Sequence, residues 1–204
     1  MATSGLSAED IKLPAPDHSC STSLDAALRQ RRSVREFDAS QAVGERMLSN
    51  ILWAAAGVNR PEDGRRTNPT ALNKQEIDIY VFDASGVSRY NCSDHSLTKV
   101  ADGDHRSLVA GTKAFSQDFV MDAPVSLVLV ADLDKFDGGV SERTLTMGMA
   151  DAGIVSQNIN LFCAANGLAT VPRATMDADG IRTLLGLGGA QVPALNNPVG
   201  YEKK

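Results

Sequence analysis

Residues 141–166 read SERTLTMGMADAGIVSQNINLFCAAN, and their apolar side chains recur at steps of three and four residues. This period predicts one long helix that begins near Ser141 and that Gly167 is placed to end. Small residues such as Gly148 and Gly153 leave little side-chain bulk around part of the helix. We therefore expect a helix that is buried on nearly all sides and that can pack tightly against another subunit.

Strand patterns lie on both sides of this helix. PVSLVLVAD at residues 124–132 is a continuous apolar run, which predicts a central strand covered on both faces. QEIDIYVFD at 75–83 alternates as a strand should, and LATV at 168–171 predicts a short strand. The proline-interrupted ALNNPVGY at 194–201 predicts a strand at the edge of the sheet. The sequence thus predicts an α+β fold with helices packed on a mixed sheet.

The chain of 204 residues is long enough for one domain with a full core. Residues 1–22 contain prolines and serines without a period, and we expect them to form an extended N-terminal arm. Residues 23–204 are then the single domain. Its first element is a short helix that Ser23 can cap and that runs into a group of arginines.

The segments between these elements are less regular. Residues 43–55 predict an amphipathic helix, which Gly57 can close in a left-handed conformation. Residues 59–75, rich in Pro, Gly, Asn and Arg, predict a long loop. Residues 86–112 predict a polar hairpin followed by a short helix, and a final helix is expected around residues 181–185.

The composition limits the possible functions. A hydrophobic content of 43% and a charged content of 22% are typical of a globular protein. The net charge of -5 argues against a nucleic-acid partner, because nucleic-acid binding needs a basic footprint. No stretch resembles a membrane span, and residues 1–20 lack the layout of a signal peptide. We expect a cytoplasmic protein without a membrane partner, or an exported one if a cleaved signal precedes the given sequence.

The cysteines and histidines form no catalytic or metal-binding pattern. The three cysteines are widely spaced, and the three histidines show no HExxH motif, so we expect no metal site, no disulfide framework and no catalytic histidine. Cys163 lies within the apolar helix and is interpreted as a small core residue.

QRRSVREF at residues 30–37 is the most distinctive polar stretch. Its arginines and serine offer fork-shaped donors and a hydroxyl, which suit phosphate oxygens. The spacing alone nevertheless favours a solvated helix end. The other motifs of the chain must decide between these interpretations.

Four motifs in order resemble the nitroreductase family of FMN-dependent oxidoreductases. They are RRSVREF at 31–37, NPTALNKQ at 68–75, GIVSQNINLFCAANGLATVP at 153–172 and VGY at 199–201. The resemblance covers most of the chain, from about Leu24 to Tyr201. It implies a mainly antiparallel sheet surrounded by helices, with the long helix at the interface of a homodimer.

The resemblance also implies a role for each matched residue. FMN would lie at the subunit interface, with its phosphate and adjoining atoms on Arg31, Arg32 and Ser33 and its N1/O2 edge on Arg35. No side chain is expected to act as a catalytic acid or base, because the flavin N5 atom performs the chemistry. The other subunit would contribute a loop with Pro69, Thr70, Ala71, Asn73 and Gln75. Pro172, Arg173 and Ala174 would form a loop with a backbone N–H that points toward N5. Lys203 is the last predicted cofactor-binding residue.

Some of these assignments leave alternatives open. Asn73 and Gln75 can instead cap their own loop, and Lys203 and Lys204 can be a solvated tail. Arg60, Arg65 and Arg66 can line a substrate entrance or belong to a solvated loop.

The implied function is an oxidoreductase working in two half-reactions. NADH or NADPH reduces the flavin, and a small electron-poor acceptor, a nitroaromatic or a quinone, reoxidises it. The alternatives are a flavin-dependent dehydrogenase of an unknown substrate and a flavin-binding protein of the same fold without significant turnover.

Overall fold

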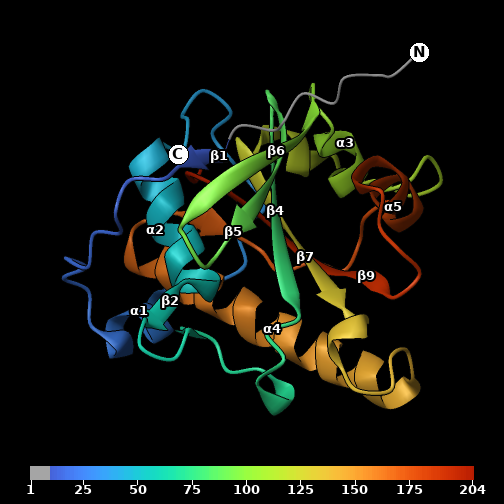
Figure 1. Cartoon of the computed structure of the whole chain (residues 1–204). Helices are drawn as coiled ribbons and strands as arrows, with labels where there is room; N and C mark the ends of the chain where they lie inside the picture. Colours follow the sequence, from blue (N-terminus) through green and yellow to red (C-terminus); the bar gives the residue numbers. More distant parts are fainter. Residues whose placement is uncertain (1–9) are drawn as a thin grey trace.

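The computed structural model describes residues 10–204, which build a seven-stranded sheet covered by helices on both faces (Figure 1). The strand order is β1-β6-β5-β4-β7-β9-β8, and each of these ladders is antiparallel. A separate hairpin consists of β2 (Val58–Arg60) and β3 (Arg65–Arg66). The strands of the main sheet are β1 (Asp10–Lys12), β4 (Ile77–Asp83), β5 (Gly86–Asn91), β6 (Ser96–Asp102), β7 (Val125–Asp132), β8 (Ala169–Thr170) and β9 (Gln191–Gly200).

Helices form a layer on each face of this sheet. The helices are α1 (Leu24–Gln30), α2 (Glu45–Ala56), α3 (Arg106–Ala110), α4 (Glu142–Ala165) and α5 (Ala178–Leu185), with short 3-10 turns η1 (Ala71–Asn73), η2 (Asp118–Asp122) and η3 (Leu133–Lys135). α2 and α4 pack on Ile79 and Leu127, whereas α3 and α5 pack on Phe82 and Val128. Alternate residues of β4 and β7 therefore enter two different cores, which is why both strands are apolar on both faces. The α+β prediction is confirmed.

The long helix α4 lies close to the sheet at one point. A Cβ atom added to Gly148 would lie 3.0 Å from Ala131 Cβ and 3.1 Å from Leu133 Cδ2, so a glycine permits this approach. On the solvent side, Leu145 and Met149 are 38% and 37% exposed. The expectation of burial on nearly all sides is thus not met within residues 10–204, because an apolar strip of α4 stays partly exposed there.

The prediction for Gly57 is wrong in its conformation. α2 does end there, but Gly57 has an extended backbone with φ of -68°. A Cβ atom at this position would lie 2.4 Å from Trp53 Cδ1. The glycine is needed because the Trp53 ring covers it, and not because the chain turns left-handed.

The prediction that the last strand lies at the sheet edge is also wrong. β9 lies between β7 and β8, and the two-residue strand β8 forms the edge. Only Val199 and Gly200 of β9 pair with β8. Much of the outer edge of β9 therefore has no pairing with β8. Prolines are tolerated on such an unpaired edge, because they lack an N–H to donate.

Two stretches predicted as irregular contain ordered elements. Residues 10–12 of the expected arm form β1 on the edge of β6, and residues 1–9 lie outside the described part of the chain. The expected loop at 59–75 contains the β2–β3 hairpin and η1. Among residues 10–204, no helix has the length and apolar composition needed to cross a bilayer.

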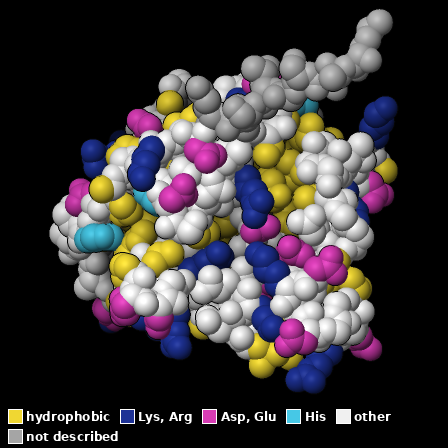
Figure 2. All heavy atoms as spheres, viewed as in Figure 1, with side chains coloured by type: hydrophobic (Ala, Val, Ile, Leu, Met, Phe, Trp, Pro, Cys, Tyr) yellow, Lys and Arg dark blue, Asp and Glu magenta, His cyan; other side chains and the backbone are white. Residues whose placement is uncertain are grey.

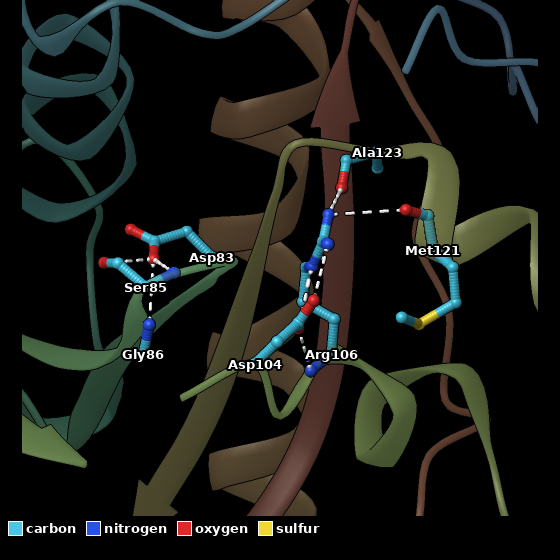
Figure 3. Close-up of polar contacts among 7 residues, drawn as sticks. All are labelled: Asp83, Ser85, Gly86, Asp104, Arg106, Met121 and Ala123. Atoms are coloured by element: carbon cyan, nitrogen blue, oxygen red, sulfur yellow. Dashed lines mark hydrogen bonds and ion pairs between the residues drawn. The ribbon is translucent and has the colours of Figure 1, made fainter. Parts of the chain in front are cut away.

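Arg106 at the start of α3 holds the chain that leads into β7 (Figure 3). Its guanidinium donates to the carbonyl oxygens of Ala123 at 2.9 Å and Met121 at 3.3 Å, and it pairs with Asp104 at 2.6 Å. The Arg106 side chain is only 14% exposed. These contacts satisfy two carbonyl groups just before the central strand begins.

Arg106→Lys should lower the free energy of unfolding by about 1–3 kcal/mol, because an ammonium group cannot reproduce the fork that serves three acceptors. Urea unfolding measures the change. Arg29→Lys is the matched control, since Arg29 pairs with Asp25 on the surface and should show no measurable change. Equal stability of the two variants would refute the role given to Arg106.

Candidate functional site

The arginine-rich segment runs beside the C-terminal tail. Val34 N–H donates to Thr170 O at 3.0 Å, and Lys203 N–H donates to Glu36 O at 3.1 Å. The structure therefore brings Lys203 next to the arginines. The other predicted cofactor residues of this segment are the half-buried Arg31 and the exposed Arg32, Ser33 and Arg35.

A cavity of about 460 Å³ opens beside this segment. Arg32 stands on one side of it and forms an ion pair with Glu202 at 2.5 Å. Asn160 of α4 and Thr170 of β8 stand on another side, and the buried Asn197 donates to both, at 3.0 and 3.3 Å. The cavity combines a basic rim, which one carboxylate of the same chain partly neutralises, with a hydrogen-bonded polar wall.

Arg173 is a buried cation next to this region. Its side chain donates to Gln117 Oε1 at 2.8 Å, to Asn196 Oδ1 at 2.7 Å and to two backbone carbonyls of α3 at 3.0 Å each. All of these acceptors are neutral, and no carboxylate of residues 10–204 pairs with Arg173. Burial first, and then the charge of Arg35, together lower the pKa of Arg173 to about 10. The Arg173 side chain thus faces the interior, as a fixed charge near Arg35.

The turn after β8 offers one free backbone donor. Pro172 has no N–H, and Arg173 donates its own to Asn196 O at 2.8 Å. Ala174 N–H has no backbone acceptor within the described part of the chain. Of the three residues predicted here, Ala174 is therefore the one whose N–H can reach a ligand.

The second predicted motif forms a tight loop around η1. Leu72, Asn73 and Gln75 adopt left-handed φ values of 54°, 53° and 51°, each of which costs roughly 1 kcal/mol in a residue with a side chain. Thr70 Oγ1 accepts from Gln75 N–H at 2.9 Å. The Gln75 side chain donates to Gly64 O at 3.1 Å, so this amide caps its own loop. Asn73 and Pro69 keep exposed side chains.

One chain attaches this loop and the arginine segment to separate points of α4. Ala71 N–H donates to Asp151 Oδ2 at 2.6 Å. The cavity beside Arg32 is lined instead by Asn160 and Ala164. At the rise of an α-helix, these residues lie roughly 14–20 Å farther along α4. The two predicted halves of the site are not brought together within a single chain.

The arginines of the β2–β3 hairpin are engaged locally. Arg60 donates to Arg66 O at 3.2 Å, and Arg65 pairs with Asp63 at 3.0 Å. Arg66 is half-buried and donates to Ile77 O at 3.4 Å. These contacts brace the hairpin and favour a structural role over a substrate entrance.

A pair of buried acids was not found from the sequence. Glu76 is 0% exposed and Asp151 of α4 is 5% exposed. Burial, and then the neighbouring carboxyl of Asp151, raises the pKa of Glu76 to about 7. The available signal was a carboxylate on the apolar face of the predicted long helix, where Asp151 stands one turn before Val155.

The histidines and cysteines show no catalytic arrangement in the described residues. His95 lies between Ser49 Oγ at 2.8 Å and Tyr90 Oη at 2.7 Å, which occupies both ring nitrogens. Cys163 is fully buried in the core, and burial raises the pKa of its thiol. Within residues 10–204, no three His, Cys, Asp or Glu side chains converge as metal ligands.

An antiparallel sheet between two helical layers, with a basic cavity beside its edge strand, defines an α+β protein with a candidate site for an anionic ligand. The family model described as the Nitroreductase family matches residues 28–201. A Methanocaldococcus jannaschii protein named "Putative nitroreductase MJ1384" is 32% identical over 185 residues, covering 87% of this chain and 90% of that protein. The chain belongs to the Nitroreductase family, which supports an oxidoreductase.

Solved structures agree with this assignment. A crystal structure is known of a protein from Ralstonia eutropha JMP134 that is described as a "putative nitroreductase". The two sequences are 34% identical, the TM-score is 0.87, and the match covers 98% of this chain and 92% of that chain. A relative from Desulfovibrio desulfuricans, solved in complex with FMN, shares the fold at 22% identity and a TM-score of 0.61, covering 89% and 87% of the two chains.

The free energy of unfolding of the wild type should decrease as the pH rises to neutral and alkaline values, and Glu76→Gln should remove this decrease. The folded-state pKa of Glu76 is raised from 4.5 to about 7, so the folded protein keeps a proton that the unfolded chain releases. Wild-type stability should therefore fall, by about 3 kcal/mol from this group, as the pH rises from 4.5 to 7.

Urea unfolding of both proteins at acid and alkaline pH measures this difference. The variant should gain on the wild type as the pH rises. Parallel stability profiles of wild type and variant would show that Glu76 is not held neutral.

Proposed function

We propose that this chain is an FMN-dependent oxidoreductase that works as a homodimer. The observation that carries the proposal is the buried charge of Arg173, which has no carboxylate partner in the described chain and lies near Arg35. Such a cation favours a negatively charged ligand in its neighbourhood. The family membership and the FMN complex of the Desulfovibrio desulfuricans relative support FMN as that ligand.

The residues present fit the anionic part of FMN. Arg31, Arg32 and Ser33 offer guanidinium and hydroxyl donors beside the cavity, and Lys203 adds a cation from the neighbouring tail. We assign these residues to the phosphate, because fork-shaped donors match its oxygens.

A second group of residues suits the ring of the cofactor. Arg35 would stabilise negative charge at the N1/O2 edge, with the fixed charge of Arg173 behind it. The free N–H of Ala174 would donate to the ring near N5, next to Pro172. Arg173 contributes here through its charge and the position of its backbone, since its own N–H is used within the chain.

A second subunit would complete the site. The Pro69–Gln75 loop, with Thr70, Ala71 and Asn73, is anchored away from the arginine segment of the same chain. Large apolar side chains are exposed nearby, a pattern that marks protein interfaces. They are Leu24 and Leu28 on α1, Leu72 in the loop, and Leu145 and Met149 on α4.

The proposed reaction needs no acid or base from the protein. FMN, when bound, supplies hydride and electron transfer at its N5 atom. NADH or NADPH would be the transient donor and a nitroaromatic or quinone the acceptor. The protein would bind and orient these molecules in the cytoplasm, with no nucleic acid or membrane taking part.

Anaerobic mixing of the FMN-loaded protein with NADH or NADPH tests the reaction. Loss of the visible flavin absorbance on addition of either donor, and its return with a quinone or a nitroaromatic, is the expected result. If the protein binds FMN but neither donor reduces it, the proposal fails in favour of a dehydrogenase of another substrate or of a binding protein.

Arg35→Ala should weaken FMN binding roughly tenfold to hundredfold, because it removes a charged donor from the ring. It should also make the reduction potential more negative, since the reduced flavin would lose a stabilising cation. Flavin fluorescence titration and anaerobic redox titration measure both effects. Arg89→Ala, on β5, is the control, because Arg89 pairs with Asp78 and does not line this cavity. If both variants behave alike, the assigned role of Arg35 is wrong.

Glu202→Gln should tighten FMN binding by roughly 1.5- to 5-fold, because Arg32 would no longer be paired with a carboxylate at the cavity. The same fluorescence titration at low salt measures it. An unchanged or weaker affinity would place the phosphate away from Arg32.

A further inference from the structure

Glu76 is a buried acid without a hydrogen-bond donor. Its side chain is fully buried, and neither Oε1 nor Oε2 has a partner among residues 10–204. A lone carboxylate in such a place is strongly unfavourable. The group must therefore either hold a proton or share one with a neighbour.

Asp151 is that neighbour, and it also holds the candidate cofactor loop. Its buried carboxyl is close enough to raise the pKa of Glu76, and its Oδ2 accepts from Ala71 N–H at 2.6 Å. Two adjacent buried carboxyl groups cannot both be charged at low cost. One proton between them lets Glu76 donate to Asp151 while Asp151 still accepts from the loop.

Other charged groups around Glu76 face its backbone or other partners. Lys135 of η3 donates to Gln75 O at 3.1 Å, and Arg66 of β3 donates to the same oxygen at 3.5 Å. Asp132 of β7 uses its N–H for Glu76 O at 3.0 Å, and its carboxylate accepts from the Asp134 N–H. The remaining pairs are Lys74 with Asp137 and Lys135 with Asp78.

The loop needs such a restraint because its backbone is strained. Three of its residues, Leu72, Asn73 and Gln75, are left-handed without being glycine. Leu72 at the tip is 69% exposed, so packing within the chain does not hold it. Strained conformations of this kind persist only where the surroundings fix them.

We propose that Glu76 and Asp151 share one proton, and that this proton holds the Thr70–Gln75 loop in its cofactor-binding form. This inference rests on the proposed function, in which that loop meets FMN bound to the partner subunit. The two acids are positioning residues: they act through Ala71 N–H and do not touch the cofactor. Loss of the shared proton at alkaline pH places two negative charges together and weakens the attachment of the loop.

The test compares FMN affinity at about pH 6 and about pH 8.5 in the wild type and in Glu76→Gln. The wild type should lose about tenfold more affinity than the variant over this range, because the amide keeps donating to Asp151 at every pH. The titration of FMN itself is common to both proteins and cancels in this comparison. Equal losses in the two proteins would overturn the inference.

Two further variants sharpen this result. Glu142→Gln makes the same change at an exposed position in the first turn of α4 and should retain the wild-type pH dependence. Asp151→Asn prevents a double charge from the other side and should remove the dependence, as Glu76→Gln does. It also keeps the test open if Glu76→Gln does not fold. A persistent pH dependence in Asp151→Asn would contradict the shared proton.

Amide hydrogen exchange of the loop in cofactor-free protein separates this inference from the proposed function. After correction for intrinsic rates, protection around Ala71 should fall with rising pH in the wild type and stay constant in Glu76→Gln. If the wild type binds no FMN at any pH, the proposed function fails, and the exchange data alone decide on the proton pair. Constant wild-type protection would refute the pair as a restraint on the loop.

Discussion

The close approach of α4 to β7 at Gly148 is the contact on which the rest of the structure depends. A Cβ atom there would meet Ala131 Cβ and Leu133 Cδ2 at about 3 Å, so the helix or these neighbours would have to shift by a few tenths of an ångström. Because α4 lies where it does, Asp151 reaches the Ala71 N–H in its first half, and Asn160 reaches Asn197 beside the cavity in its second half. One helix therefore sets the positions of both groups of candidate cofactor residues.

Arg173 and Glu76 are buried ionisable side chains that have no oppositely charged partner among residues 10–204, and the structure accommodates them differently. Arg173 remains charged, surrounded by four neutral acceptors, and its field extends toward the exposed Arg35. Burial, and then the neighbouring carboxyl of Asp151, raises the pKa of Glu76 and so favours its neutral form. The first suits an anionic ligand outside the chain, and the second fixes a loop without exposing a charge to it.

Much of the fold could be predicted from periodicity, because local pattern reports which faces of a segment are buried. The apolar run of β7 and the long period of α4 are two such cases, and both are present as predicted. Features that depend on contacts distant in sequence could not be found this way. The conformation of Gly57 is set by the Trp53 ring, and the place of β9 is set by pairing with β8.

The candidate site shows the same division. The resemblance identified Arg32, Ser33 and Lys203, and the structure brings their segments side by side. The resemblance could not show that the Gln75 amide donates to Gly64 O, or that the Arg173 side chain is buried in the core. Both features depend on tertiary contacts. Asp151 was visible only as an acid on an apolar helix face, with no sign of its partner Glu76.

Each cofactor site is proposed to combine residues of two chains, and a crystal structure of the protein reconstituted with FMN would reveal both contributions. We expect flavin density between the Arg31–Arg35 segment of one subunit and the Pro69–Gln75 loop of its partner, with the ring near Ala174. Flavin bound entirely within one subunit, or away from Arg35, would contradict it.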